Sequence, residues 1–301
     1  MARLADALQR ANITRVAHPS PQSEPAAAPQ PSVSVTKPHA AERPHLPAGA
    51  TSLLGFPKGD PQMPGWRTDP ELVGKLVGTK DVSSGALEQY RKLAATLHHA
   101  QEERGIQVVM TASSLPGEGK SLTAANLALT LSESYQRRVL LVDADLRRPT
   151  VQRLFGVATI EGLDAGLKAP HDRPMALTRL SERLWVLPAG RPDPDPLSGL
   201  TSDRMKRFVQ EARGRFDWVI IDTPPVSLLP DANLLAANVD GVLLVVRAGK
   251  APFQLVKRTV DTIGHDRILG IVMNAVDYRH DRNAGGYYEY YGYGYYGVAK
   301  D

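Results

Sequence analysis

The sequence predicts an α/β fold built on an open, doubly wound, mostly parallel sheet. Six runs rich in Val, Ile and Leu show no polar alternation, which is typical of strands buried on both faces. Helical periodicity fills the intervals between them, and this alternation indicates parallel strands covered by helices. We expect strands at 106–111, 138–143, 184–188, 217–222, 241–247 and 268–274. We expect the intervening helices at 120–134, 202–214, 232–237 and 253–263.

Segments of different composition flank this region. Twelve of the 24 prolines fall within residues 1–70, and proline at that density blocks helices and central strands. We therefore expect a Pro/Ala-rich disordered arm at 1–70 and a globular domain at 71–278, which opens with an amphipathic helix over 84–100. Glycine and tyrosine dominate residues 279–301, for which we expect a flexible tail.

The composition excludes several classes of protein. The chain has no cysteine, which removes disulfide scaffolds, thiolate zinc fingers, iron–sulfur proteins and cysteine nucleophiles. The net charge of +4 is small for 301 residues and the basic residues are dispersed, so we expect no nucleic-acid partner. No apolar run approaches the roughly 18 residues of a membrane helix, and no signal peptide is recognisable. We expect a cytoplasmic protein.

A loop with two glycines joins the first strand to the helix after it. Residues 114–121 read Ser-Leu-Pro-Gly-Glu-Gly-Lys-Ser and match a phosphate-binding Walker A loop, except that Ser114 stands where the pattern has glycine. Glycine lets backbone N–H groups close around phosphate oxygens at the positive end of a helix dipole. Lys120 would reach the terminal phosphates, and the Ser121 hydroxyl would bind Mg²⁺. The expected ATP contacts in this loop are Pro116, Gly117, Glu118, Gly119, Lys120, Ser121 and Leu122.

Carboxylates end two further strands. Asp143 and Asp145 follow one apolar run at i, i+2 spacing, and Asp222 ends another. Ligands of open parallel sheets bind at the carboxyl ends of the strands, so these carboxylates should meet the Walker A loop. A single Asp after a strand is more often a helix cap. Three such segments in the order of a phosphate-binding ATPase instead favour Mg²⁺ binding, with Asp222 in the Walker B role.

A tyrosine cluster lies near the end of the chain. Seven of the ten tyrosines fall between residues 287 and 296, interspersed with glycines. Considered alone, this segment could be an aromatic low-complexity sticker. Beside a complete phosphoryl-transfer site it favours autophosphorylation, which we expect in trans between subunits. The candidate phosphoacceptors are Tyr287, Tyr288, Tyr290, Tyr291, Tyr293, Tyr295 and Tyr296.

These motifs together resemble the bacterial tyrosine kinases of capsule and exopolysaccharide synthesis, whose kinase domain is a P-loop ATPase. The similarity runs over about 88–296 and includes Val-Asp-Ala-Asp-Leu-Arg at 142–147 as the family's additional Walker A′ box. It also includes Ile-Ile-Asp-Thr-Pro-Pro at 220–225 as Walker B. The resemblance implies a protein-tyrosine kinase that uses ATP and Mg²⁺.

The resemblance also assigns roles to single residues. Lys120 would hold the phosphates, and Ser121, Asp143 and Asp222 would surround the metal. Asp143 or Asp145 would accept the proton of the attacking tyrosine, with no basis in the sequence for choosing between them. Asn274, which ends the last strand, would contact the adenine base, although an Asn there is as often a turn residue.

The family packs subunits into a ring through a Glu-x-x-Arg-x-x-Arg helix. Glu88 and Arg91 match the first two positions, but Ala94 stands at the third. Glu88 and Arg91 are therefore candidate oligomer contacts, and a solvated helical face with an i, i+3 ion pair is an equally good interpretation.

The partners follow from the resemblance alone. It implies a transmembrane chain-length regulator whose cytoplasmic tail activates the kinase at the inner face of the membrane. It further implies a homo-oligomer in which the tail enters a neighbour's site, and a tyrosine phosphatase.

Two alternative functions stay open. One is a P-loop ATPase of the partitioning and septum-positioning type, which has Lys where this chain has Leu115, and the other is a weakly active ATP-binding scaffold.

Overall fold

The computed structural model of the chain describes residues 52–57, 74–79, 82–157, 161–170, 173–226 and 231–276. The tyrosine tail and all of the expected arm except residues 52–57 lie outside the described residues.

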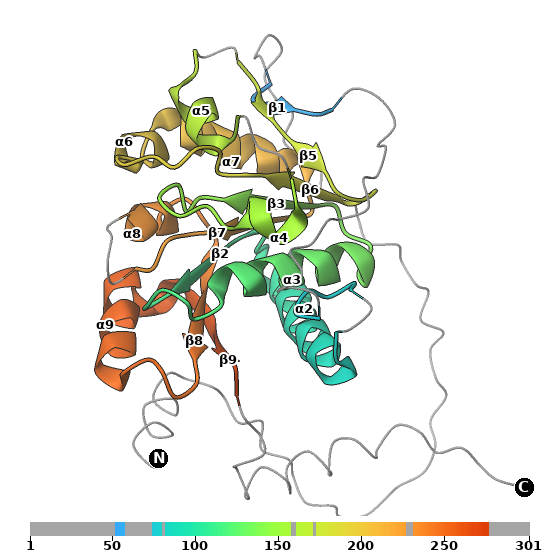
Figure 1. Ribbon diagram of the computed structural model, residues 1–301, viewed down its shortest axis with the longest axis vertical. Helices are drawn as coiled ribbons and strands as arrows, with labels where there is room; N and C mark the ends of the chain where they lie inside the picture. Colours follow the sequence, from blue (N-terminus) through green and yellow to red (C-terminus); the bar gives the residue numbers. More distant parts are fainter. Residues whose placement is uncertain are drawn as a thin grey trace, which may run out of the picture. The chain divides into compact units, whose positions relative to one another are not determined.

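Seven strands form one central sheet in the order β5-β6-β3-β7-β2-β8-β9 (Figure 1). Neighbouring strands are parallel, apart from β5, which runs antiparallel to β6. The mostly parallel sheet is as predicted, and each of the six predicted strands is present within two residues of its expected bounds. The strands are β2 (Val108–Ser113), β3 (Val139–Asp143), β5 (Thr178–Arg179), β6 (Leu184–Leu187), β7 (Trp218–Asp222), β8 (Gly241–Arg247) and β9 (Ile268–Asn274).

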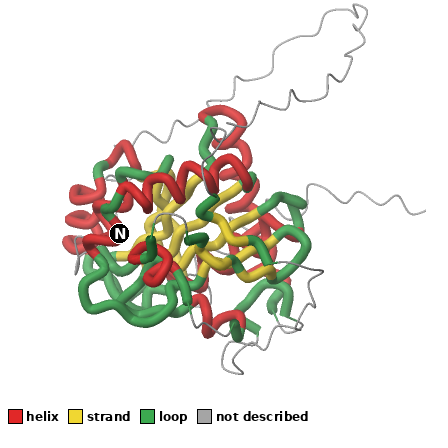
Figure 2. Tube along the Cα trace, turned by 90° about the horizontal axis from the view of Figure 1, so that it is seen from above, coloured by secondary structure: helices red, strands yellow, loops and turns green. Residues whose placement is uncertain are grey.

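Helices cover both faces of this sheet (Figures 1 and 2). One face carries α2 (Ser84–Arg104), α3 (Lys120–Glu133) and α4 (Val151–Phe155). The other carries α5 (Leu163–Lys168), α6 (Leu197–Leu200), α7 (Asp203–Arg215), α8 (Asp231–Ala236) and α9 (Phe253–Ile263), and a 3₁₀ turn, η2 (His265–Arg267), leads into β9. The five predicted helices are present, whereas α4, α5 and α6 were not predicted. None of the described helices is long and apolar enough to cross a lipid bilayer.

Two apolar cores lie on opposite sides of the sheet, and successive strand residues alternate between them. On β2, Val109 belongs to the core under α3, whereas Met110 belongs to the core under α7. On β7, Ile220 and Ile221 divide in the same way, and all four side chains are fully buried. This double burial explains why the strands appear in the sequence as unbroken apolar runs.

Residues 52–57 correct the expected boundary of the arm, because they are part of the fold. β1 (Leu54–Gly55) pairs in parallel with β4 (Met175–Ala176) in a separate two-stranded sheet. The N–H of Leu53 donates a hydrogen bond of 2.7 Å to the carboxylate of Glu211 on α7. Both leucines of this segment are buried. A composition averaged over 70 residues conceals so short an apolar insertion.

An aromatic contact completes the docking of this segment. The ring of Phe56 lies edge-on to Trp185, with 6.4 Å between ring centroids, and stacks on Phe216 at 6.0 Å. Such contacts add to the stabilisation that comes from burial alone.

Candidate functional site

The predicted Walker A loop, residues 114–121, connects β2 to α3 at the carboxyl edge of the sheet (Figure 1). Gly117 and Gly119 have φ angles of 75° and 94°, in the left-handed region that favours glycine. Gly119 is also the N-cap of α3, so no side chain covers the first N–H groups of this 14-residue helix. Exposed N–H groups at a helix N-terminus are the usual binding site for a phosphate.

The ends of two neighbouring strands, β8 and β9, brace this loop through Glu118. The buried carboxylate of Glu118 accepts hydrogen bonds from the N–H groups of Leu115, at 2.6 Å, and Arg247, at 3.3 Å. The side-chain amide of Asn274 donates to the carbonyl of Glu118 over 2.8 Å. Glu118 and Asn274, both expected to contact the nucleotide, are thus placed where their side chains hold the loop in shape.

Lys120 joins the loop to the acidic strand ends. Its Nζ lies 3.0 Å from Asp145 Oδ2, 3.5 Å from Asp222 Oδ1 and 3.2 Å from Ser121 Oγ. Burial alone would lower the pKa of Lys120, but the charges of Asp222 and Asp145 outweigh it and raise the pKa. The lysine is therefore a buried cation at the N-terminus of α3.

Asp143 and Asp222 lie side by side, because they are register partners on the neighbouring strands β3 and β7. Burial, and then the charge of Asp222, raise the pKa of Asp143 to about 7, against the hydrogen bonds that it accepts from the N–H groups of Val151 and Thr150. Burial likewise raises the pKa of Asp222, although Lys120 opposes it. The site thus concentrates more acidic groups than its one lysine can neutralise.

The residues fit a Mg²⁺–nucleotide complex. Asp222 Oδ2 is buried without a hydrogen-bond partner in the described part of the chain, and Ser121 hydrogen-bonds to the same carboxylate. Within the described ranges, no three acidic, His or Cys side chains form a cage for a metal ion. Mg²⁺ does not need one, since it is usually held by one or two carboxylates together with substrate phosphates and water.

The other predicted site residues are placed less centrally. Pro116 is exposed at the outer turn of the loop, and Leu122 is half-buried in the first turn of α3. Glu88 and Arg91 are exposed on α2, whereas Ala94 is completely buried against the core. The candidate phosphoacceptor tyrosines lie outside the described residues.

Sequence reasoning overlooked one residue of the site, Arg247. It ends β8, its N–H donates to Glu118, and its guanidinium donates to the carbonyl of Gly117 over 3.4 Å. The available signal was the sequence Val-Val-Arg-Ala-Gly at 245–249, in which an arginine follows the apolar run of β8 directly. It gave no role for the arginine, because contact with the loop depends on the pairing of β8 with β2.

Comparisons with known proteins agree on the family. Residues 105–296 match the family model described as ParA: NUBPL iron-transfer P-loop NTPase. Tyrosine-protein kinase YwqD of Bacillus subtilis (strain 168) is 37% identical over 190 residues, which cover 62% of this chain and 80% of YwqD. The kinase domain of Escherichia coli tyrosine kinase ETK superimposes with a TM-score of 0.65 at 26% identity, covering 77% of this chain and 92% of the ETK domain.

A longer relative shares the same region. The succinoglycan biosynthesis transport protein ExoP of Rhizobium meliloti (strain 1021) is 34% identical over 180 residues, which cover 57% of this chain and only 22% of ExoP. The description of the family model includes iron transfer, but this chain has no cysteine with which to bind an iron–sulfur cluster. The chain belongs to the bacterial tyrosine kinases, whose catalytic domain is a P-loop NTPase of the ParA type.

Proposed function

We propose that this protein is an ATP-dependent autokinase that phosphorylates tyrosines in its own C-terminal tail. The observation that carries the proposal is the buried cluster of Lys120, Asp145 and Asp222 beside the open N-terminus of α3. Phosphoryl transfer needs little from a protein beyond positioning and charge, and this cluster supplies both. The proposed acceptors are the seven tyrosines between Tyr287 and Tyr296.

ATP would bind through the loop N–H groups and Lys120, and Mg²⁺ through Ser121 and Asp222. When bound, Mg²⁺ neutralises charge on the phosphates. The ammonium of Lys120 now lies 3.0 Å from Asp145, and its attraction to the phosphates would free that carboxylate. Binding of ATP would therefore release a base for the incoming tyrosine.

The two candidate bases differ in their hydrogen bonds. Asp143 accepts from the N–H groups of Asp145, Thr150 and Val151 at 3.1, 2.9 and 2.9 Å, which uses both of its oxygens. Asp145, by contrast, accepts from the N–H of Arg148 on Oδ1 alone, and its Oδ2 is held by the side chain of Lys120, which ATP would attract. We assign Asp145 as the base and Asp143 as the residue that positions the loop after β3 and stands beside the metal.

The tail would be phosphorylated in trans, within a homo-oligomer to which the exposed Glu88 and Arg91 of α2 contribute contacts. Each phosphotyrosine adds about −1.5 to −2 charges, so several of them on one short segment repel each other. Phosphorylation would thereby loosen the oligomer, and a tyrosine phosphatase would restore it.

The biological setting is inferred from relatives. ExoP is named for the biosynthesis and transport of a polysaccharide, and this chain matches only about a fifth of it. We propose that this chain acts in the cytoplasm, where the cytoplasmic tail of a transmembrane chain-length regulator recruits it to the membrane and activates it, and that it regulates polymer assembly and export. Equal autophosphorylation with and without that tail would contradict this activation.

One assay tests the enzymatic proposal. The full chain is incubated with ATP and Mg²⁺ and phosphotyrosine is mapped by mass spectrometry, with Lys120→Ala as the inactive control. Phosphate on tail tyrosines only in the unaltered protein is the expected result. ATP hydrolysis without phosphotyrosine would instead indicate the partitioning type of ATPase, and neither activity would indicate a scaffold.

A mixing experiment tests the trans direction. A Lys120→Ala chain with an intact tail is combined with an active chain in which the seven clustered tyrosines are Phe. Phosphotyrosine on the Lys120→Ala chain is expected, and its absence would show that transfer does not pass between chains.

A further inference from the structure

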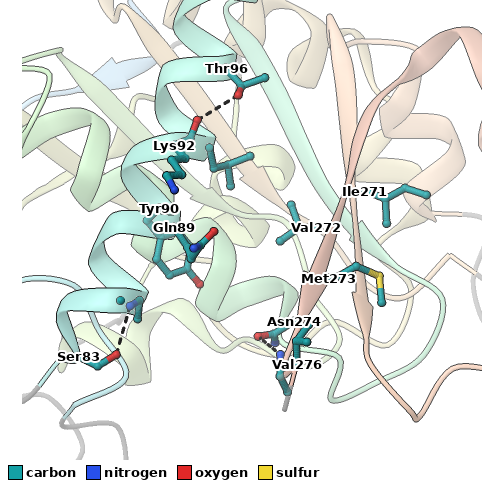
Figure 3. A pocket seen from close by; sticks show the side chains of 14 residues that line it. Ser83, Gln89, Tyr90, Lys92, Thr96, Ile271, Val272, Met273, Asn274 and Val276 are labelled. Carbon is teal, nitrogen blue, oxygen red and sulfur yellow. Dashed lines mark hydrogen bonds between the residues drawn. The ribbon is translucent and has the colours of Figure 1, made fainter. Parts of the chain in front are cut away.

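A groove of about 930 Å³ separates the first half of α2 from the end of β9 (Figure 3). Ala86, Tyr90 and Leu93 line its helix side. From the strand side, Val272 and Asn274 point toward the helix, whereas Ile271 and Met273 point away to the opposite face of the sheet (Figure 3).

β9 is an edge strand that has the composition of an inner one. It ends the strand order and pairs only with β8 among the described strands. Ile271 and Met273 are 40% and 51% exposed, and Val276 just beyond the strand is 37% exposed. Edge strands are usually protected by charged residues or proline, and β9 has neither. Apolar side chains on both faces of such an edge are expected when a further strand covers it.

The chain itself supplies a candidate for that strand. It leaves the sheet at this edge, where Ala275 turns with a φ of 53°, and 25 residues follow Val276. The sequence Asn-Ala-Gly-Gly at 283–286 is a turn signal, and the tyrosines after it have high strand propensity.

We propose that residues 287–293 of the unphosphorylated tail pair with the outer edge of β9 as an antiparallel strand. Because side chains of a strand alternate between faces, every second residue would enter the groove beside α2. The others would cover Ile271 and Met273. The tail would thus rest on its own chain before it reaches a neighbour's active site.

Phosphorylation would prevent the tail from returning to this position, a consequence that rests on the proposed kinase activity. A phosphate group carries about two negative charges and loses free energy when it is placed against apolar side chains. Lys92 is the single charged side chain among the residues that line the groove, and one cation does not balance several phosphates. The docked strand would therefore be specific for the unmodified tail.

Docking would also reach the nucleotide loop. Asn274 lines the groove and, through its amide, holds the carbonyl of Glu118 in the loop. A strand paired alongside β9 would steady this contact, so the resting tail and the shape of the phosphate-binding loop are coupled.

The absence of native cysteine allows a direct test by disulfide formation. Met273→Cys is combined with a cysteine at each position from 287 to 293 in turn, in the full chain, after phosphatase treatment and without ATP. Intrachain disulfides are quantified by non-reducing electrophoresis and mass spectrometry. We expect the highest yield at one tail position, lower yields two residues to either side of it and the lowest yields at the residues between, because only side chains opposite or diagonal to residue 273 on the same face approach it.

The matched control is Phe253→Cys, at a side chain that is 48% exposed on α9, combined with the same tail positions. Its yields should be low and show no alternation. Uniform yields at Met273→Cys, or yields no higher than the control, would overturn the proposal. Disulfides that form only between chains would also overturn it, and would assign the groove to a second copy.

Addition of ATP and Mg²⁺ separates this proposal from the proposed activity. In the active protein the alternating yields should fall, and in a Lys120→Ala background they should persist. Alternation without any phosphotyrosine would leave the docked tail supported and the kinase proposal refuted. Phosphotyrosine without alternating yields would support the kinase proposal and refute the docked tail.

Discussion

The side-chain amide of Asn274 donates a hydrogen bond of 2.8 Å to the backbone carbonyl of Glu118 and so joins the last residue of β9 to the phosphate-binding loop. A Cβ atom on the adjacent Gly119 would collide with this amide, so the loop and the strand end are packed against each other. The loop is shaped by its neighbours before any ligand binds.

Asn274→Ala should therefore weaken nucleotide binding about tenfold, since it leaves a loop carbonyl without its donor. The turnover of bound ATP should change less, because the amide of Asn274 holds a carbonyl of the loop and not the carboxylates of Asp145 and Asp222. The dissociation constant of a fluorescent ATP analogue, together with kcat and KM, checks this. Asn274→Asp is the matched control, because it keeps the size of the side chain but cannot donate, and it should weaken binding at least as much as alanine, since its charge also repels the carbonyl and the phosphates. Unchanged affinity in both would contradict the role of the amide.

Loss of the Lys120 charge should destabilise the protein as well as inactivate it. Lys120→Met leaves Asp145 and Asp222 buried without a cation, and breaking a buried pair in this way typically costs about 3–5 kcal/mol. A second change, Asp222→Asn, removes one of the stranded charges. The double variant should accordingly be more stable than Lys120→Met alone. Urea denaturation of the two single variants and the double variant measures this coupling, and simple additivity would speak against it.

Asp143 should make the stability of the nucleotide-free protein depend on pH. Its pKa is about 7 in the folded state against an ordinary 3.8, so the folded protein binds the proton more tightly than the unfolded chain. The free energy of unfolding should then decrease as pH rises from about 4 to about 7, and level off above that range.

The slope of stability against pH is the quantity to measure, by denaturant titrations at several pH values. Asp143→Asn removes the titrating group and should flatten the slope, whatever its effect on overall stability. An equally steep slope in that variant would assign the dependence to another group.

Asp240 should contribute to stability far from the nucleotide site. Its carboxylate accepts hydrogen bonds of 2.8 Å from the N–H groups of Gln107 and Val108 and pairs with both terminal nitrogens of Arg213. These contacts keep the pKa of Asp240 below its usual range, although burial opposes them. Asp240→Ala should reduce the free energy of unfolding by about 1–3 kcal/mol, seen as a lower Tm. Asp203→Ala is the control, since its exposed ion pair with Lys206 and its place in the first turn of α7 together contribute little to stability, so the Tm should fall by less than in Asp240→Ala.

The parts of the fold that were predictable are those with strong local signals. Continuous apolar runs identified the inner strands, and the glycine spacing identified the loop before α3. The short helix α4 has no such signal in its five residues. The N–H groups of Thr150 and Val151 at its start are satisfied by Asp143, a residue that the sequence assigned to the metal or to proton transfer. Contacts of this kind are set by tertiary structure, so periodicity does not reveal them.

The residues that converge at the site were predicted, whereas the contacts that hold its loop in shape were not. Lys120, Asp145 and Asp222 do converge, as strand ends of a parallel sheet must. The bracing of the loop by Glu118 and Arg247 was not foreseen, because a glutamate inside a phosphate-binding motif is read as a ligand contact. The side chain of Glu118 is instead buried, and its carboxylate accepts hydrogen bonds from backbone N–H groups such as that of Leu115 in the loop.

The docked segment at residues 52–57 determines how this protein can be shortened. A chain cut at residue 71, where the composition changes, would lose the strand whose carbonyls accept from the N–H groups of Met175 and Leu177. It would also uncover Trp185 and Phe216 to solvent. Deletions that stop before Ser52 spare these contacts. A shortened chain should therefore begin at or before Ser52, because Leu53 and Leu54 belong to the apolar core and Phe56 packs against it.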